Sequence, residues 1–220
     1  MGGDHAPEAP VLGALQAVKD FDAQIILMGR GPEILDVLKK NGIEDLPDGV
    51  QIAHADDVVD MHDDPADAVR KKKNSSMMLG LRMLAEGEGD AFVSAGSTGA
   101  LLSGATLLVK RVKGVRRAAM GPSIPNKKGG KTVILDCGAN AECTPEFLLQ
   151  FGLMGALYAK KNMGIQSPRI GLLNIGTEDT KGTPLQKEAY ALLKDAGDRG
   201  IINFVGNTEA RDVPLGAVDV

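Results

Sequence analysis

A short stretch of small residues, 94–99 (SAGSTG), could hold an anion against its backbone, because it follows an apolar run and precedes a helical pattern. Backbone N–H groups at a helix start have no partner within the helix, and the helix dipole adds partial positive charge there. Gly96 and Gly99 would let a ligand approach the backbone, while Ser97 and Thr98 add hydroxyl donors. This pattern predicts a phosphate site, and a tight turn with an N-cap explains it equally well. It is neither a dinucleotide fingerprint nor a P-loop.

Four other polar, Gly-bearing stretches have the same character. They are residues 1–7 (MGGDHAP), 136–140 (DCGAN), 174–182 (NIGTEDTKG) and 206–212 (GNTEARD). Three of them follow apolar runs. In a parallel sheet, the loops at the carboxyl ends of the strands line one crevice. Several such loops on one edge are harder to explain as turns alone, so they favour a binding site.

Alternating apolar strands and helical patterns must position these loops. We expect strands at residues 24–28, 51–53, 90–93, 131–135, 169–173 and 202–205, and helices at 32–40, 75–86, 98–110, from 145 and from 184. Thr144 precedes Pro145 as a helix cap, and residues 183–186 have the form of a capping box. Continuous apolar strands separated by helices predict an α/β fold with a mostly parallel sheet covered on both faces.

Composition excludes several classes of protein. The chain has 220 residues, 43% of them hydrophobic and 25% charged, with a net charge of −4 and only 3% aromatic residues. An acidic chain with few aromatic residues is unlike a nucleic-acid binder. Two cysteines form no disulfide framework and suit a reducing cytoplasm, where we expect the protein. No apolar run has the length of a membrane span, and no signal peptide is visible.

Both ends of the sequence look incomplete. The chain opens in a Gly-rich loop without a preceding strand, and residues 217–220 (AVDV) read like the start of a strand. We therefore expect residues 1–220 to form a single, incomplete α/β domain.

Six motifs in order resemble the bacterial phosphate acyltransferases of phospholipid synthesis. They are MGGDHAP, RKKKNSSM, SAGSTGALL, LDCGAN, LLNIGTEDTKG and NFVGNTEARD, and they run the whole length of the chain. The resemblance implies transfer of a fatty acyl group from acyl carrier protein to inorganic phosphate, giving acyl phosphate. It also implies a Rossmann-like α/β/α fold, related to phosphotransacetylases and to isocitrate and isopropylmalate dehydrogenases. A homodimer with peripheral membrane association is implied as well, through parts beyond these 220 residues.

The resemblance suggests catalytic roles for three residues, each with an alternative. Lys181 could neutralise phosphate or the thioester oxyanion, or be a solvent-exposed loop lysine. Asn140 could donate to an oxyanion or only cap its loop. Asp136 could orient Lys181 or cap a helix. The implied mechanism is direct attack of phosphate on the thioester, with no organic cofactor and no metal.

Phosphate contacts are expected from a larger set of residues. Asp4 could orient Lys181 or act as an N-cap. Ser75 and Ser76 follow the basic residues 70–73, and read as a helix cap or as a second anion-facing element. The complete expected set is Asp4, Ser75, Ser76, Gly96, Ser97, Thr98, Gly99, Thr177 and Glu178.

Three tempting readings are weaker. Cys137 could form a thioester as a nucleophile, but a small buried residue at a strand end is the commoner case, and the family pattern calls for no cysteine there. A catalytic role for His5 is disfavoured as well, because the family's Met-Gly-Gly-Asp loop does not depend on a histidine after it. Residues 54–67 hold six Asp and two His, yet an acidic, solvated loop explains them without a metal, because no ligand spacing is present.

Two rival functions remain open. An NAD-dependent decarboxylating dehydrogenase of similar fold would need clustered metal-binding aspartates and an adenine-ribose pocket. A non-catalytic phosphate or nucleotide sensor would bind phosphate without any dependence on acyl carrier protein.

A basic run, residues 110–117 (KRVKGVRR), predicts a docking surface for the acidic carrier protein. A helix C-terminus favours one or two cations through its dipole, and five exceed that need. The five are Lys110, Arg111, Lys113, Arg116 and Arg117.

Overall fold

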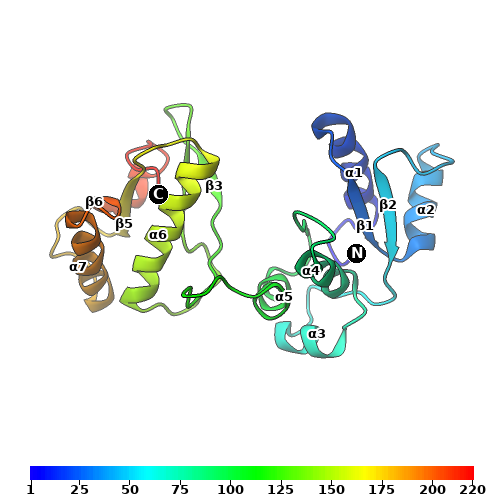
Figure 1. Ribbon diagram of the computed structural model, residues 1–220, viewed down its shortest axis with the longest axis horizontal. Coiled ribbons are helices and arrows are strands. Elements are labelled where there is room, and N and C mark those ends of the chain that lie inside the picture. The colour runs from blue at the N-terminus through cyan, green and yellow to red at the C-terminus, as the bar shows by residue number, and fades with distance from the viewer. The chain divides into compact units, whose positions relative to one another are not determined.

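The computed structural model describes residues 1–220, and its helices and strands fall into two units, Met1–Arg111 and Val112–Val220 (Figure 1). Within them, two of the three strand pairs are parallel and one is antiparallel. The expected α/β fold with mostly parallel pairing is confirmed at this level. None of the helices combines the length and apolarity needed to cross a bilayer.

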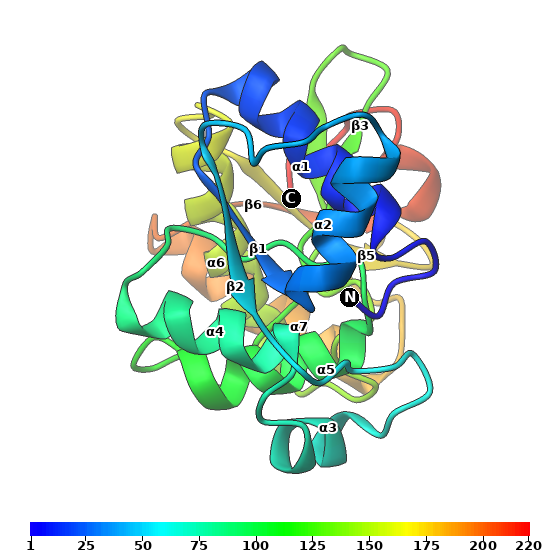
Figure 2. The same ribbon diagram turned by 90° about the vertical axis from the view of Figure 1, so that its right-hand side faces the viewer.

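The first unit contains a parallel strand pair. β1 (Ile25–Gly29) pairs with β2 (Val50–His54), and the two run side by side in Figure 2. α1 (Glu8–Phe21) and α2 (Gly31–Lys40) bury apolar residues against this pair, and α2 supplies the crossover that a parallel pair requires. The shared core consists of Val11, Leu15, Leu27, Ile34, Val37, Leu38 and Val50.

A second, helical core lies in the same unit. It joins α3 (Pro65–Lys71), α4 (Ser76–Glu86) and α5 (Thr98–Gly104), and α5 runs on into one π-helical turn at Ala105–Val109. Its buried residues are Val59, Ala68, Met77, Met78, Leu81 and Ala100.

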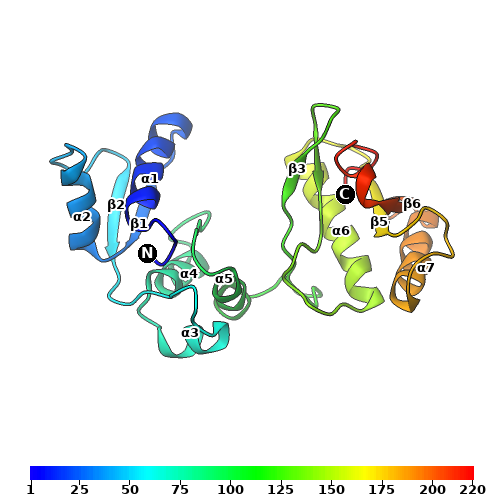
Figure 3. The ribbon, with the colours of Figure 1, turned by 180° about the vertical axis from the view of Figure 1, so that it is seen from behind.

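The second unit packs two long helices beside short strands (Figure 3). β3 (Ser123–Pro125) and β4 (Lys131–Val133) form an antiparallel hairpin, whose turn is the largely exposed loop at residues 126–130. α6 (Pro145–Asn162), β5 (Arg169–Asn174), α7 (Pro184–Asp198) and β6 (Asn203–Glu209) follow, and a 3-10 turn at Ala210–Asp212 comes after β6. β5 and β6 pair in parallel over a core of Ile170, Leu172, Ala189, Leu193, Ala196 and Ile202.

Residues 218–220 lie between β4 and β5. The Val133 N–H donates to Asp219 O at 2.9 Å, the Gly171 N–H donates to Val220 O at 2.9 Å, and the Val220 N–H donates to Arg169 O at 3.1 Å. These backbone bonds tie the segment to both strands, but residues 217–220 form no strand of their own, so the strand start expected there is not confirmed. The Arg169 guanidinium also donates twice to the Asp219 carboxylate, at 3.0 and 2.9 Å.

This ion pair predicts acid-sensitive stability. Burial raises the pKa of Asp219, but hydrogen bonds from Arg169 outweigh it, so the pKa lies below its usual range. A depressed carboxylate pKa adds stability that is present above the unfolded-state pKa of about 3.9 and is lost as the pH falls through the folded-state pKa. We expect Asp219→Asn to lower the free energy of unfolding by about 1–3 kcal/mol at pH 7.

Urea unfolding at pH 7 and at steps down to pH 3 measures the free energy of unfolding of the parent protein and of Asp219→Asn. The difference between these two free energies should narrow as the pH falls below about 4. Asp195→Asn is the control, because it removes a partner of Arg199 from an exposed pair that contributes little. A gap that stays constant with pH would show that the Asp219 charge is irrelevant.

One expected strand is wrong and one expected loop is partly wrong. Residues 90–93 form no strand: a Cβ at Gly80 would lie 2.3 Å from the Phe92 ring, and Val93 is 92% exposed. Phe92 therefore packs on α4, while its neighbours Ala91 and Val93 are exposed. Residues 206–209, expected in a loop, extend β6.

The structure contains two helices and one strand that the sequence did not predict, α1, α3 and β3. α1 contains Pro10, which usually argues against a helix, but Pro10 lies in the first turn, where an N–H has no helical partner anyway. α3 has only seven residues and β3 three, too short for a clear period.

Candidate functional site

Three segments of the first unit meet at residues 94–99. A Cβ on Gly3 would lie 2.8 Å from Ala95 O, and one on Gly96 would lie 3.6 Å from Met77 Cε at the start of α4. Gly2 has a φ of +93°, and a Cβ there would lie 2.3 Å from Val59 O. The opening loop can approach the 94–99 loop this closely because it lacks side chains at these positions.

Two of the expected phosphate-binding hydroxyls act as helix caps. Ser97 Oγ accepts from the Ala100 N–H at 3.4 Å at the start of α5, and Ser75 Oγ accepts from the Met78 N–H at 3.4 Å at the start of α4. Both serines are buried, whereas Thr98 is exposed. Thr98 is therefore the hydroxyl of this loop that faces solvent.

Ser76 and Asp4 likewise differ in exposure, since Ser76 is buried and Asp4 is exposed. Ser76 is buried, and its N–H donates to Asp57 O at 3.2 Å. Asp4 is exposed and caps no helix, because Pro7 is the N-cap of α1. The N-cap reading of Asp4 is therefore wrong.

The basic residues before Ser75 are largely neutralised. Arg70 and Lys71 pair with Asp67 at 2.8 and 2.9 Å, and Lys72 pairs with Asp63 at 2.5 Å. Three of the four cations at residues 70–73 thus have carboxylate partners, which weakens this cluster as an anion-facing element.

In the second unit, Asp136 and Asn140 form a polar latch. Asp136 Oδ1 accepts from the Met120 N–H at 2.7 Å, and Oδ2 accepts from the Asn140 N–H at 2.7 Å and from Asn140 Nδ2 at 3.1 Å. Asn140 Nδ2 also donates to Ala118 O at 2.9 Å. Burial raises the pKa of Asp136, but hydrogen bonds from Met120 and Asn140 outweigh it and lower the pKa. The Asp136 and Asn140 side chains thus form these hydrogen bonds with groups of the same unit.

Lys181 lies in the loop between β5 and α7. Its side chain is about half exposed, and Nζ lies 3.8 Å from Glu178 Oε1. Thr177 and Glu178 are exposed in the same loop. The Lys181 N–H donates to Glu178 O at 3.1 Å, which closes a turn, so the three residues stand together on one tight loop.

Two asparagines that the sequence reading missed hold this loop. Asn174 Nδ2 donates to Lys181 O at 3.1 Å and to Asn207 Oδ1 at 3.2 Å, and Asn207 Nδ2 donates to Glu178 O at 2.7 Å. Gly182 has a φ of +92°, and a Cβ there would lie 2.7 Å from Asn174 Oδ1. The available signal was an amide residue at the end of each of two neighbouring apolar strands.

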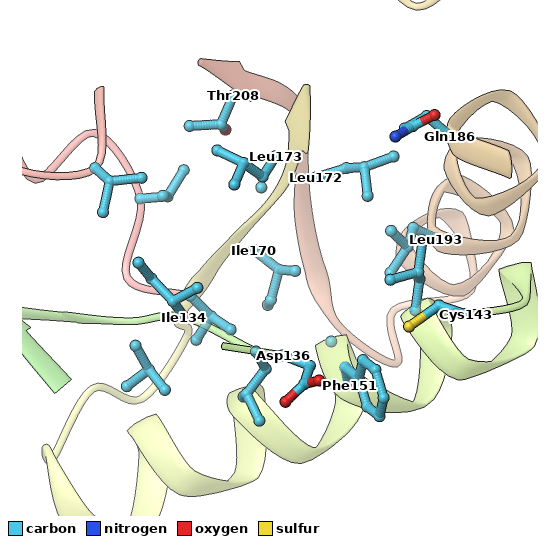
Figure 4. Close-up of a pocket in the computed structure, with 18 of the residues that line it drawn as sticks. Ile134, Asp136, Cys143, Phe151, Ile170, Leu172, Leu173, Gln186, Leu193 and Thr208 are labelled. Carbon is cyan, nitrogen blue, oxygen red and sulfur yellow. The ribbon is translucent and has the colours of Figure 1, made fainter. Parts of the chain in front are cut away.

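A cavity of about 320 Å³ lies beside the latch (Figure 4). Phe151, Ile170 and Leu193 are among the apolar side chains that line it, and Asp136, Asn140 and Cys143 line it as well. A second, smaller set of residues surrounds a hollow at the start of the Lys181 loop, and both hollows share Leu173 and Gln186. The latch and the start of the Lys181 loop therefore border two hollows that have lining residues in common.

The expected docking run crosses the boundary between the units. Lys110 and Arg111 close the first unit, while Lys113, Arg116 and Arg117 belong to the second. All five are exposed, and none forms an ion pair. Their positive charge is thus free to attract a partner.

Cys137 is exposed, so the small buried residue expected at this strand end is wrong, and its N–H donates to Met120 O at 3.0 Å. Burial, with a smaller contribution from the Asp136 charge, raises the pKa of Cys143, which disfavours its thiolate. No group of three or more His, Cys, Asp or Glu side chains is arranged to hold a metal ion.

A family model described as "Fatty acid synthesis protein" matches residues 1–220. The chain belongs to this family. Its curated relatives include a phosphate acyltransferase of Bacillus cereus (strain B4264), 45% identical over 221 residues, and one of Desulfitobacterium hafniense (strain DSM 10664 / DCB-2), 47% identical over 221 residues. Each match covers 100% of this chain and 64% of the relative, so the chain spans less than two thirds of their length.

Solved structures similar to this family member are phosphotransacetylases. The EutD phosphotransacetylase from Staphylococcus aureus gives a TM-score of 0.68 at 17% identity, over 97% of this chain and 72% of that one. A phosphotransacetylase from Streptococcus pyogenes also gives 0.68, at 20% identity, over 93% of this chain and 66% of that one. At such low identity these matches show a shared fold.

Proposed function

We propose that this protein transfers a fatty acyl group from acyl carrier protein to inorganic phosphate, giving acyl phosphate for phospholipid synthesis. The observation that carries the proposal is the 45–47% identity, over every residue of the chain, to relatives named phosphate acyltransferase. The polar loops that end in Lys181, Asn140 and Gly99 lie within that match.

The proposed reaction is one direct displacement. An oxygen of hydrogen phosphate attacks the thioester carbonyl carbon, a C–O bond forms, and the C–S bond breaks. The proton of hydrogen phosphate passes to the departing thiolate of the carrier, which leaves as a thiol. A thioester is already activated, so positioning of phosphate and stabilisation of the oxyanion suffice, with no acyl-enzyme and no cofactor.

Within the second unit, Lys181 is proposed to stabilise the negative charge that develops on the thioester oxygen. The 94–99 loop of the first unit is an expected anion-binding loop, through its amides and the exposed Thr98 hydroxyl. Asp136 and Asn140 position their loop, because their hydrogen bonds are used within the unit.

Partners, assembly and location complete the proposal. The acidic carrier protein docks on the five basic residues of 110–117, and the two units belong to one Rossmann-like α/β/α domain, related also to the decarboxylating dehydrogenases. We further propose a cytoplasmic homodimer with peripheral membrane association, as the family resemblance implies.

Release of the carrier thiol tests this function. We expect the protein to free thiol from acyl carrier thioester only when phosphate is present, as a thiol reagent would record. Release at the same rate without phosphate would indicate a hydrolase. Phosphate binding without any release would indicate a sensor.

A further inference from the structure

Gln150 of α6 forms two hydrogen bonds with the backbone of the segment that carries Arg116 and Arg117. Its Oε1 accepts from the Arg116 N–H at 2.9 Å, and its Nε2 donates to Gly114 O at 3.0 Å. One side chain thus satisfies a backbone donor and a backbone acceptor two residues apart. A loop held in this way keeps its backbone in place while its side chains stay exposed.

The same segment is fixed at two further points. The Arg117 guanidinium lies over the Phe147 ring of α6, 5.6 Å from its centroid. Beyond it, the latch of Asp136 and Asn140 binds the backbone at residues 118 and 120. Residues 114, 116 and 117 are therefore attached to α6, and residues 118 and 120 to the 136–140 loop.

The charges on this segment are not consumed by those contacts. Arg116 and Arg117 are exposed and form no ion pair, and the Gln150 bonds use only backbone groups of the segment. The acidic group near them is Glu146, whose carboxylate interacts with the charge of Arg116 without forming an ion pair and accepts from Thr144 Oγ1 at 2.6 Å. Cations with a fixed backbone lose less conformational freedom on binding than cations on a mobile loop.

We propose that Gln150 and Phe147 are positioning residues that hold Arg116 and Arg117 ready for an acidic protein partner. The partner is the acyl carrier protein of the proposed function, on which this inference rests. The two residues act through the arginines and contact no reacting atom. They should therefore affect the carrier-bound donor and leave a donor without the carrier unaffected.

Two donors separate these effects. With acyl carrier thioester, we expect Gln150→Ala to raise KM roughly three- to tenfold, as the loss of two hydrogen bonds implies, with kcat nearly unchanged. With the same acyl group on pantetheine, KM should not change. Phe147→Leu should act in the same direction, and Phe147→Tyr should restore the parent value, because it keeps an aromatic face for the guanidinium.

The control is Gln166→Ala, an exposed glutamine of the same unit without a side-chain hydrogen bond. Titration with carrier protein that bears no acyl group gives a readout independent of turnover, and its Kd should rise by the same factor in Gln150→Ala. Equal effects on both donors, or an unchanged Kd, would overturn the inference while the proposed function stands. If the parent protein uses neither donor yet the Kd shift appears, the docking surface is supported and the acyl transfer is wrong.

Discussion

Replacing Lys181 with Ala is expected to lower kcat/KM for acyl phosphate formation by about 100- to 1000-fold, the effect of removing one group that stabilises an oxyanion. The loop backbone at Lys181 and Glu178 is held by Asn174 and Asn207, while Nζ remains about half exposed and 3.8 Å from Glu178. The structure thus fixes the base of this side chain, and its ammonium group stays solvent-accessible in a long ion pair with Glu178.

Steady-state rates with acyl carrier thioester and phosphate measure the effect. Lys181→Arg keeps a cation and should recover part of the activity. Lys187→Ala is the matched control, because Lys187 is exposed on the neighbouring helix and forms no ion pair. A Lys181→Ala enzyme within a few-fold of the parent would make Lys181 an ordinary surface residue.

Reversing the charge of both arginines, Arg116→Glu with Arg117→Glu, is expected to raise KM for acyl carrier thioester several-fold. Exposed charges act mainly on the rate of association, and they are screened beyond about 8 Å at physiological ionic strength. Added salt should therefore also raise the parent protein's KM for acyl carrier thioester. KM for phosphate and kcat should change little.

Lys160→Glu with Lys161→Glu is the control for this pair, since it makes the same charge change at two exposed lysines near the end of α6. If the arginine variant keeps its affinity for the carrier and loses phosphate binding, Arg116 and Arg117 belong to the active site and the carrier docks elsewhere.

Local sequence signals were sufficient to predict where a helix or strand begins when a few neighbouring residues determine that start. The capping box at residues 183–186 begins α7 where expected, because caps act within one turn. α6 also begins at Pro145 as expected, although the Thr144 hydroxyl donates to Glu146 and caps no backbone N–H. The apolar runs at β1 and β5 likewise predict strands that the structure confirms, as does the short run at β2.

The failures concern partners distant in sequence. Residues 90–93 have a strand-like composition, but whether they pair depends on a neighbour, and Phe92 packs on Gly80 instead. The roles of Asn140 and Ser97 could not be decided either, since the sequence does not show that Ala118 O and the Ala100 N–H already bind their side chains. Asn207 was missed because its contact with Glu178 spans 29 residues.

Mass spectrometry of the product made from acyl carrier thioester and phosphate labelled with oxygen-18 tests the central claim most directly. Direct attack by a phosphate oxygen on the thioester carbon predicts acyl phosphate that retains all four labelled oxygens, formed together with free carrier thiol. A product with only three labelled oxygens would mean that a carboxylate attacked phosphorus. Free fatty acid with no acyl phosphate would contradict acyl transfer to phosphate altogether.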